Sequence, residues 1–162
     1  MIIHVKNKNT LIIDDFEFKC CVGKNGLNFN KKEGDYSTPK GIFNLQKLYY
    51  RKDRIGIPKS NIVKKKITQK IAWCNDPSDP RYNQEILVYN KKYKENFYRE
   101  DYKYDYLITI SHNIKKIPFK GSAIFIHLTN NYKPTAGCIA LKKKDFEILL
   151  KLINKKTKIR IG

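Results

Sequence analysis

The sequence predicts a mainly β fold with minor α structure (α+β). Most apolar segments are short and are bounded by Gly, Pro, Asn or Asp, which is typical of strands and turns. A single segment, KDFEILLKLIN, spaces its apolar residues as a helix does. The chain has 162 residues, 41% of them hydrophobic, and shows no repeat or linker. We therefore expect one domain over residues 1–162.

The first half of the chain alternates predicted strands with turns. MIIHV and TLIIDDFEFKCCVG are separated by a polar stretch at 6–10 and predict a hairpin. Glycines predict a loop over 24–36, and a turn at Pro39 and Gly41 precedes the predicted strand IFNLQKLYY. The residues IAWC are predicted to form the end of another strand. The two Asp-Pro pairs after it predict an ordered loop, because a residue before proline disfavours the helical conformation.

The second half contains the predicted helices. Residues 91–103 are rich in Tyr, Lys and Glu, and we expect a short helix over 95–101. YDYLITI and SAIFIHL predict strands, and the basic segment between them predicts a loop. The segment after Cys138 ends in a helix, followed by a last strand, KIRI. The apolar face of that helix consists of Phe146, Leu149, Leu150 and Ile153.

The net charge of +19 admits three interpretations. They are nucleic-acid binding, an anionic polymer as substrate, and the Lys, Asn, Ile and Tyr bias of an AT-rich genome. The charges are spread from Lys6 to Arg160, in runs of no more than three, which disfavours a nucleic-acid interface. No apolar run approaches the roughly 18–20 residues of a membrane span.

The N-terminal segment lacks the apolar region of a secretory signal. Three explanations remain open. The protein stays inside the cell, its leader lies outside this sequence, or it is exported by another route.

The four cysteines are predicted to be free thiols. Cys20 and Cys21 are adjacent, and a disulfide between neighbours is strained. Cys74 and Cys138 belong to no CxxC pair, so the pattern is neither a disulfide framework nor a cysteine zinc site.

The stretch HLTNNYKPTAGCIAL places His127 at the end of a predicted strand and Cys138 ten residues later. A buried structural thiol, a metal site completed by His4 and His112, and a nucleophile with its base are all compatible with this spacing. A thiol attacks as thiolate, and a nearby histidine can take its proton. Gly137 would let backbone N–H groups turn towards a substrate oxygen, and Thr135 would orient the loop or form a hydrogen bond with His127.

The whole stretch GSAIFIHLTNNYKPTAGCIAL resembles the motif of the L,D-transpeptidase (YkuD-like) catalytic domain family. That motif has a strand-borne His, a variable loop, and Ser/Thr-x-Gly-Cys before an apolar residue. STPKGIFNL, WCNDPSDPRYN and YREDYKYDYLITI are also similar to segments of the family. The resemblance covers residues 22–45 and 72–162.

The resemblance implies a β-sandwich-like domain with a helix packed alongside, acting on peptidoglycan stem peptides in the cell envelope or periplasm. It implies that Cys138 is the nucleophile and His127 the proton donor and acceptor, with no metal or cofactor. Backbone N–H groups of Cys138 and Gly137 would hold the oxyanion. The product would be a cross-link, or a shortened stem if water is the acceptor.

Aromatic residues are candidates for the walls of the substrate groove. Trp73, Tyr82 and Tyr104 are the candidates, although Trp73 and Tyr104 also border apolar runs and fit a core. The sequence departs from the family at Ala140, where many members carry an arginine, and at Leu128 and Ala136.

Two other functions are alternatives to this one. An NlpC/P60-like endopeptidase is disfavoured because it places its Cys before its His. A catalytically degenerate basic module that binds the cell wall or nucleic acid is the other alternative.

Overall fold

A computed structural model describes residues 1–88 and 94–162 of the chain. Its two helices are α1 (Lys52–Ile55) and α2 (Lys143–Leu152). The strands are β1 (Ile2–Lys6), β2 (Thr10–Ile13), β3 (Phe16–Cys21), β4 (Leu27–Asn28), β5 (Thr38–Pro39), β6 (Gly41–Tyr50), β7 (Val63–Lys66), β8 (Ile71–Cys74), β9 (Glu85–Leu87), β10 (Lys94–Asn96), β11 (Tyr106–Ile110), β12 (Phe125–Leu128), β13 (Ile139–Leu141) and β14 (Lys158–Ile161).

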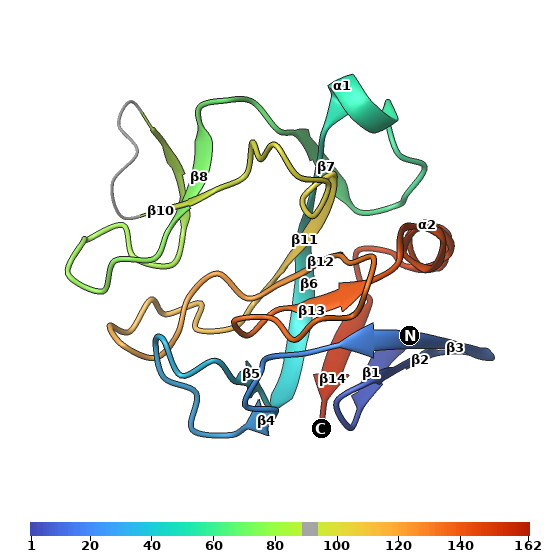
Figure 1. Ribbon diagram of the computed structural model, residues 1–162, viewed down its shortest axis with the longest axis horizontal. Coiled ribbons are helices and arrows are strands. Elements are labelled where there is room, and N and C mark those ends of the chain that lie inside the picture. Colours follow the sequence, from blue (N-terminus) through green and yellow to red (C-terminus); the bar gives the residue numbers. More distant parts are fainter. Residues whose placement is uncertain (89–93) are drawn as a thin grey trace.

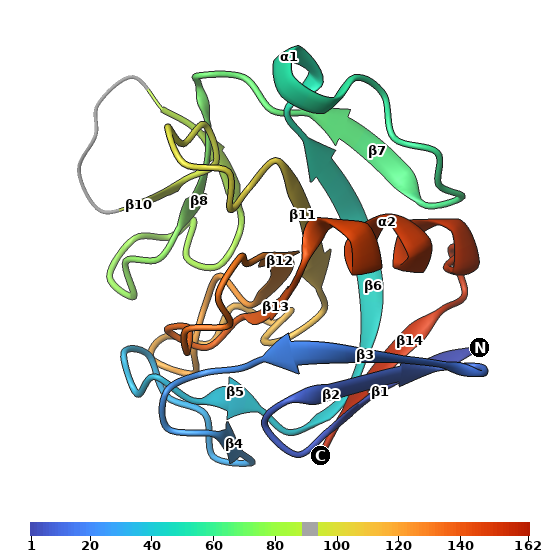
Figure 2. The same ribbon diagram turned by 45° about the vertical axis from the view of Figure 1, so that its right-hand side comes forward.

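Nine strands form one sheet that closes on itself. Their order is β11-β12-β13-β3-β2-β1-β14-β6-β7, and an additional pairing of β11 with β6 joins the two sides (Figures 1 and 2). The closure requires β6 to be long, because its first residues pair with β14 and its last six with β11. The predicted mainly β fold with a helix alongside is confirmed. No helix in the described residues is long and apolar enough to cross a membrane.

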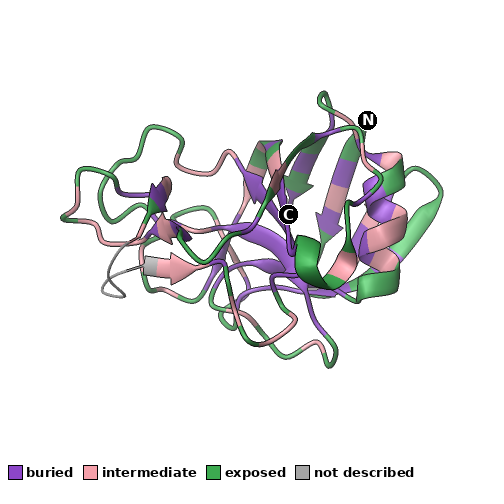
Figure 3. Cartoon of the chain, turned by 90° about the horizontal axis from the view of Figure 1, so that it is seen from above, coloured by how far each residue is buried: buried purple, intermediate pink, exposed green. Residues whose placement is uncertain are grey.

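The main core lies inside this closed sheet. Buried side chains from opposite walls, such as Leu11 on β2 and Ile108 on β11, belong to one apolar cluster. Figure 3 shows buried residues in the central strands and on the inner face of α2. The helix contributes Phe146, Leu149 and Leu150, as its spacing predicts, and the Phe146 ring stacks on Tyr106 with centroids 5.4 Å apart.

A smaller sheet, β10-β8-β9, stands beside the closed one. A second apolar cluster lies between them. In it the ring of Phe97 contacts Tyr49, Trp73, Tyr104 and Phe125 at centroid distances of 4.9–6.2 Å. Cys138 belongs to the same cluster. The packing of the small sheet therefore also shapes the surroundings of Cys138.

The local predictions have mixed outcomes. The hairpin is confirmed, since Lys6 on β1 pairs with Thr10 on β2. The predicted helix over 95–101 is wrong. Glu95 instead pairs with Trp73 as part of β10, and Arg99 binds Asp101 through its guanidinium. Pairing with β8 outweighs the weak helical preference of this polar segment.

Truncation of the helix at its buried face should destabilise the protein. Phe146 is fully buried, so Phe146→Ala leaves a cavity and should lower the free energy of unfolding by about 3–5 kcal/mol. Urea unfolding measures the change. Lys144→Ala, at an exposed position of the same helix, is the control. A loss below about 1 kcal/mol for Phe146→Ala would contradict the packing described.

Candidate active site

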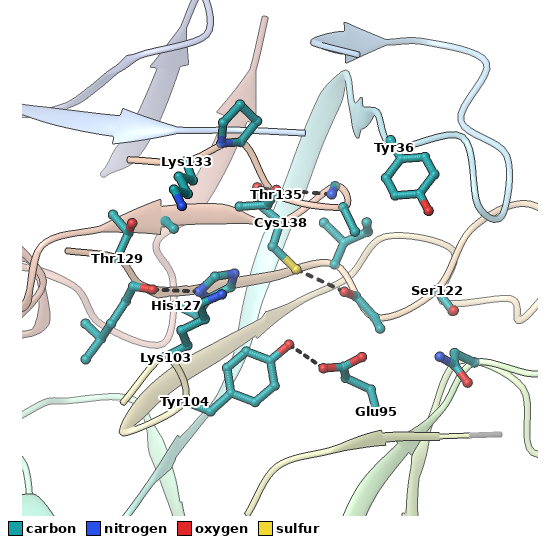
Figure 4. A pocket seen from close by; sticks show the side chains of 18 of the residues that line it. Tyr36, Glu95, Lys103, Tyr104, Ser122, His127, Thr129, Lys133, Thr135 and Cys138 are labelled. Atoms are coloured by element: carbon teal, nitrogen blue, oxygen red, sulfur yellow. Dashed lines mark hydrogen bonds between the residues drawn. The ribbon is translucent and has the colours of Figure 1, made fainter. Parts of the chain in front are cut away.

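The parallel pairing of β12 with β13 brings His127 and Cys138 to one face of the sheet. His127 lies opposite Ala140, and Cys138 stands two residues before Ala140. Alternate residues of an extended chain point to the same side, so His127 and Cys138 share that side. Figure 4 shows the imidazole beside the thiol in one cavity. The loop of ten residues between them reverses the chain so that the two strands run parallel.

The Cys138 thiol is buried and held by two backbone groups. It donates to the Ala123 carbonyl at 3.2 Å and accepts from the Phe125 N–H at 3.4 Å. Burial raises the pKa of Cys138 to about 12, and the Phe125 N–H acts in the opposite direction. At neutral pH the resting group is therefore a thiol, which must give up its proton as it attacks.

The His127 imidazole is buried in its neutral form. Burial lowers its pKa to about 4, and the positive charges of Lys103 and Arg99 act in the same direction. Nδ1 lies 2.9 Å from the Leu128 carbonyl oxygen. Because that oxygen only accepts, Nδ1 carries the proton and Nε2 keeps its lone pair. In Figure 4 the second ring nitrogen is on the side of Cys138, as proton abstraction from the thiol requires.

The turn before Cys138 depends on a glycine. Gly137 has φ +147, and a Cβ there would lie 2.8 Å from the Ser37 carbonyl oxygen. The Thr135 hydroxyl braces the same turn, since it accepts from the Gly137 N–H at 3.1 Å and donates to the Cys138 carbonyl at 2.6 Å. Thr135 thus orients the loop and does not contact His127 by any hydrogen bond in the described part of the chain.

The two backbone N–H groups expected to bind the oxyanion differ in whether they already have a hydrogen-bond acceptor in the protein. The Gly137 N–H already donates to Thr135. The Cys138 N–H has no hydrogen-bond partner among the described residues. Of these two N–H groups, the one of Cys138 is therefore available for a substrate oxygen among the described residues. Gly137 instead permits the backbone conformation of the turn.

The cavity has a volume of about 530 Å³ and carries charges of both signs. Tyr104 forms part of its wall, where its ring meets the His127 ring edge to face at 5.4 Å. The Tyr104 hydroxyl donates to Glu95 at 2.8 Å, and the Arg99 guanidinium lies over the ring. Tyr104 is thus both a core residue and a cavity residue.

Comparison with known proteins agrees with this geometry. The family model of the L,D-transpeptidase catalytic domain matches residues 2–161. The chain belongs to this family. No curated protein matches it.

Two solved structures share the fold of this family member. They are the helical cell shape determining protein Pgp2 from Campylobacter jejuni, at 18% identity and a TM-score of 0.55, and Bd1075 of Bdellovibrio bacteriovorus, at 15% and 0.51. Each match covers 99% of this chain and 46% or 47% of the other. The chain therefore spans just under half of their length, and at these identities the likeness shows the fold alone.

The other predicted groove residues lie outside this cavity. Trp73 packs on the rings of Phe97 and Phe125, and its indole N–H donates to Asn83 at 2.9 Å. Tyr82 is buried, with its hydroxyl bonded to Glu33. Both side chains are held by packing and hydrogen bonds in the wall behind the site, so the structure does not bring either of them to His127 and Cys138.

The remaining histidines lie away from the pair. His112 bonds the Lys120 carbonyl at 3.0 Å, and His4 stands on β1. Among the described residues, no group of three His, Cys, Asp or Glu side chains is placed to hold a metal ion.

Sequence reasoning missed several charged residues of the cavity. Glu95 and Arg99 fall in the segment predicted to be helical, Lys103 follows it by two residues, and Lys133 lies in a loop with no periodic pattern. The one available signal was proximity in sequence, since Lys103 precedes Tyr104 and Lys133 lies between His127 and Cys138.

The buried His127 should make stability depend on pH. The unfolded chain protonates this group below about pH 6.5, whereas the folded chain does so only near pH 4. Stability therefore falls as pH falls through this window, by about 2 kcal/mol between pH 7 and pH 5 for this group. Urea unfolding at both pH values should show that His127→Gln reduces the difference by that amount. His4→Gln is the control, and an unchanged difference in His127→Gln would refute the assignment.

Proposed function

We propose that the protein is a cysteine-dependent peptidoglycan L,D-transpeptidase. It transfers an acyl group from a tetrapeptide stem, through a thioester on Cys138, to an amine acceptor. The observation that carries this proposal is the neutral thiol of Cys138 beside the neutral imidazole of His127, in one cavity of a chain that belongs to the L,D-transpeptidase family.

Acylation begins when Cys138 Sγ attacks the carbonyl of the third stem residue. His127 Nε2 takes the thiol proton as the S–C bond forms. The Cys138 N–H donates to the developing oxyanion, in a site where burial strengthens the interaction. The C–N bond to the terminal D-alanine then breaks. The leaving amine takes the proton from His127, and a thioester remains on Cys138.

Deacylation reverses these roles. An amine of a second stem attacks the thioester carbonyl and gives its proton to His127. The thiolate leaves and recovers that proton, and a new amide bond cross-links the two stems. No step needs a metal or a redox cofactor. Thr135 and Gly137 act as positioning residues, since they shape the turn that carries the nucleophile.

The charge of the chain fits a substrate in the cell envelope. Stem peptides carry carboxylates, and a net charge of +19 raises the rate of encounter with an anionic polymer. The Campylobacter relative is described as a helical cell shape determining protein. We propose a corresponding role in the cross-linking or remodelling of the wall, with the stem peptide as partner.

Loss of the thiol should abolish the covalent intermediate. Intact-protein mass spectrometry with a tetrapeptide muropeptide should show an adduct on Cys138 and the loss of D-alanine. Cys138→Ala should show neither, because no other group in the cavity can form the thioester. Cys74→Ala, a second buried cysteine, is the matched control and should react normally. Release of D-alanine by Cys138→Ala would overturn the proposal. Product analysis then separates cross-linked stems from tripeptides that water releases.

Loss of the base should slow acylation without preventing substrate binding. His127→Gln removes the proton acceptor, and the acylation rate at pH 7 should fall by about 10²–10⁴-fold. Rapid-quench mass spectrometry of the Cys138 adduct measures this rate, with His4→Gln as the control. An acylation rate equal to that of the wild type would remove His127 from the mechanism.

A further inference from the structure

The cavity contains two ammonium groups that form no ion pair within 4.0 Å in the described part of the chain. Of its cations, Lys31 pairs with Asp35, and Arg99 pairs with Asp101 at 2.6 Å and with Glu95 at 3.4 Å. Lys103 and Lys133 also line the cavity. Neither ammonium group has an ion pair or a side-chain hydrogen bond within residues 1–88 and 94–162. The nearby Asp101 carboxylate, which interacts electrostatically with Lys103, is already bound by Arg99.

These two lysines lie on the His127 side of the nucleophile. In Figure 4 the side chains of Lys103 and Lys133 are near His127, whereas Glu95 lies on the opposite side of Cys138. The positive charge of Lys103 is one of the causes that lower the pKa of His127, which agrees with this proximity. Ala140, opposite His127 in the sheet, lines the same cavity and brings no charge to it.

The backbones that carry the two lysines are held in place. The Lys103 carbonyl accepts from the Leu128 N–H at 2.9 Å, next to His127. The Lys133 carbonyl accepts from the Cys21 thiol at 3.3 Å. Both residues are otherwise exposed, so their ammonium groups can reach a ligand without losing a partner in the protein.

The chemistry of the reaction places a carboxylate in this region. His127 must return its proton to the leaving nitrogen, so that nitrogen lies beside the imidazole. In a stem that ends in a free amino acid, the terminal carboxylate is attached to the carbon that bears this nitrogen. An anion therefore comes to the side of His127 where the unpaired cations stand. Glu95, on the other side of Cys138, disfavours the reverse orientation.

We propose that Lys103 and Lys133 form a subsite for the terminal carboxylate of the stem, and that this subsite selects stems with a free C-terminal acid. The inference rests on the proposed function and adds the specificity of its leaving-group side. Charge-assisted hydrogen bonds of this kind are stronger than neutral ones and weaken when the acid is replaced by an amide.

The experiment compares two synthetic tetrapeptide stems that differ only in a C-terminal carboxylate or carboxamide. The wild-type protein should release the terminal residue from the acid with a kcat/KM at least about tenfold higher than from the amide. Lys103→Met with Lys133→Met should reduce this ratio to about one, mainly through the acid. Lys103→Arg with Lys133→Arg should keep the preference. Lys144→Met with Lys155→Met, two exposed lysines outside the cavity, controls for the loss of two positive charges.

The outcomes separate the two proposals. Equal use of both stems by the wild type, or a preference that survives the double methionine variant, would overturn the carboxylate subsite. The proposed function would still stand if the Cys138 adduct forms. Absence of any adduct on Cys138 with either stem would overturn the proposed function itself. A double methionine variant that fails to fold is recognised by its urea unfolding, and the single variants then provide the test.

Discussion

The site depends on the parallel pairing of two short strands, β12 and β13. This register sets His127 and Cys138 on the same face, although ten residues separate them in the chain. A shift of one residue would turn one of the two side chains to the opposite face. The neighbours of the pair hold the register, because β12 is paired with β11 on its other edge and β13 with β3. The closed sheet is therefore the scaffold of the candidate chemistry.

Burial determines the protonation states at this site. The same loss of solvent raises the pKa of Cys138 and lowers that of His127, so both groups rest in the neutral form. The free protein thus differs from thiol enzymes that hold a thiolate and an imidazolium before substrate binds. The thiol instead donates to the Ala123 carbonyl, and the attack must exchange this hydrogen bond for proton transfer to His127. Tyr104 and the small sheet complete the apolar surroundings that impose this state.

The charged residues of the cavity have a different role from the charged residues of the surface. The chain carries +19, and two of the four Lys and Arg residues that line the cavity, Lys31 and Arg99, are paired with acids. Lys103 and Lys133 are unpaired among the described residues, and they stand where the reaction would bring a carboxylate. The net charge bears on the encounter with an anionic polymer, whereas the placement of these two lysines bears on which end of the substrate faces His127.

The sequence by itself determined the strand-rich fold, the amphipathic face of α2 and the motif that contains His127 and Cys138. Each of these follows from local spacing, since apolar periodicity and a short motif are visible along the chain. The sequence did not determine the conformation of 95–101, because pairing with β8 outweighed local preference. Only the tertiary structure decided that the Thr135 hydroxyl accepts a hydrogen bond from the Gly137 N–H. It also decided that Trp73 and Tyr82 lie outside the cavity and that Lys103 and Lys133 border it. Those facts depend on contacts between distant segments, and neither composition nor periodicity records which segments meet.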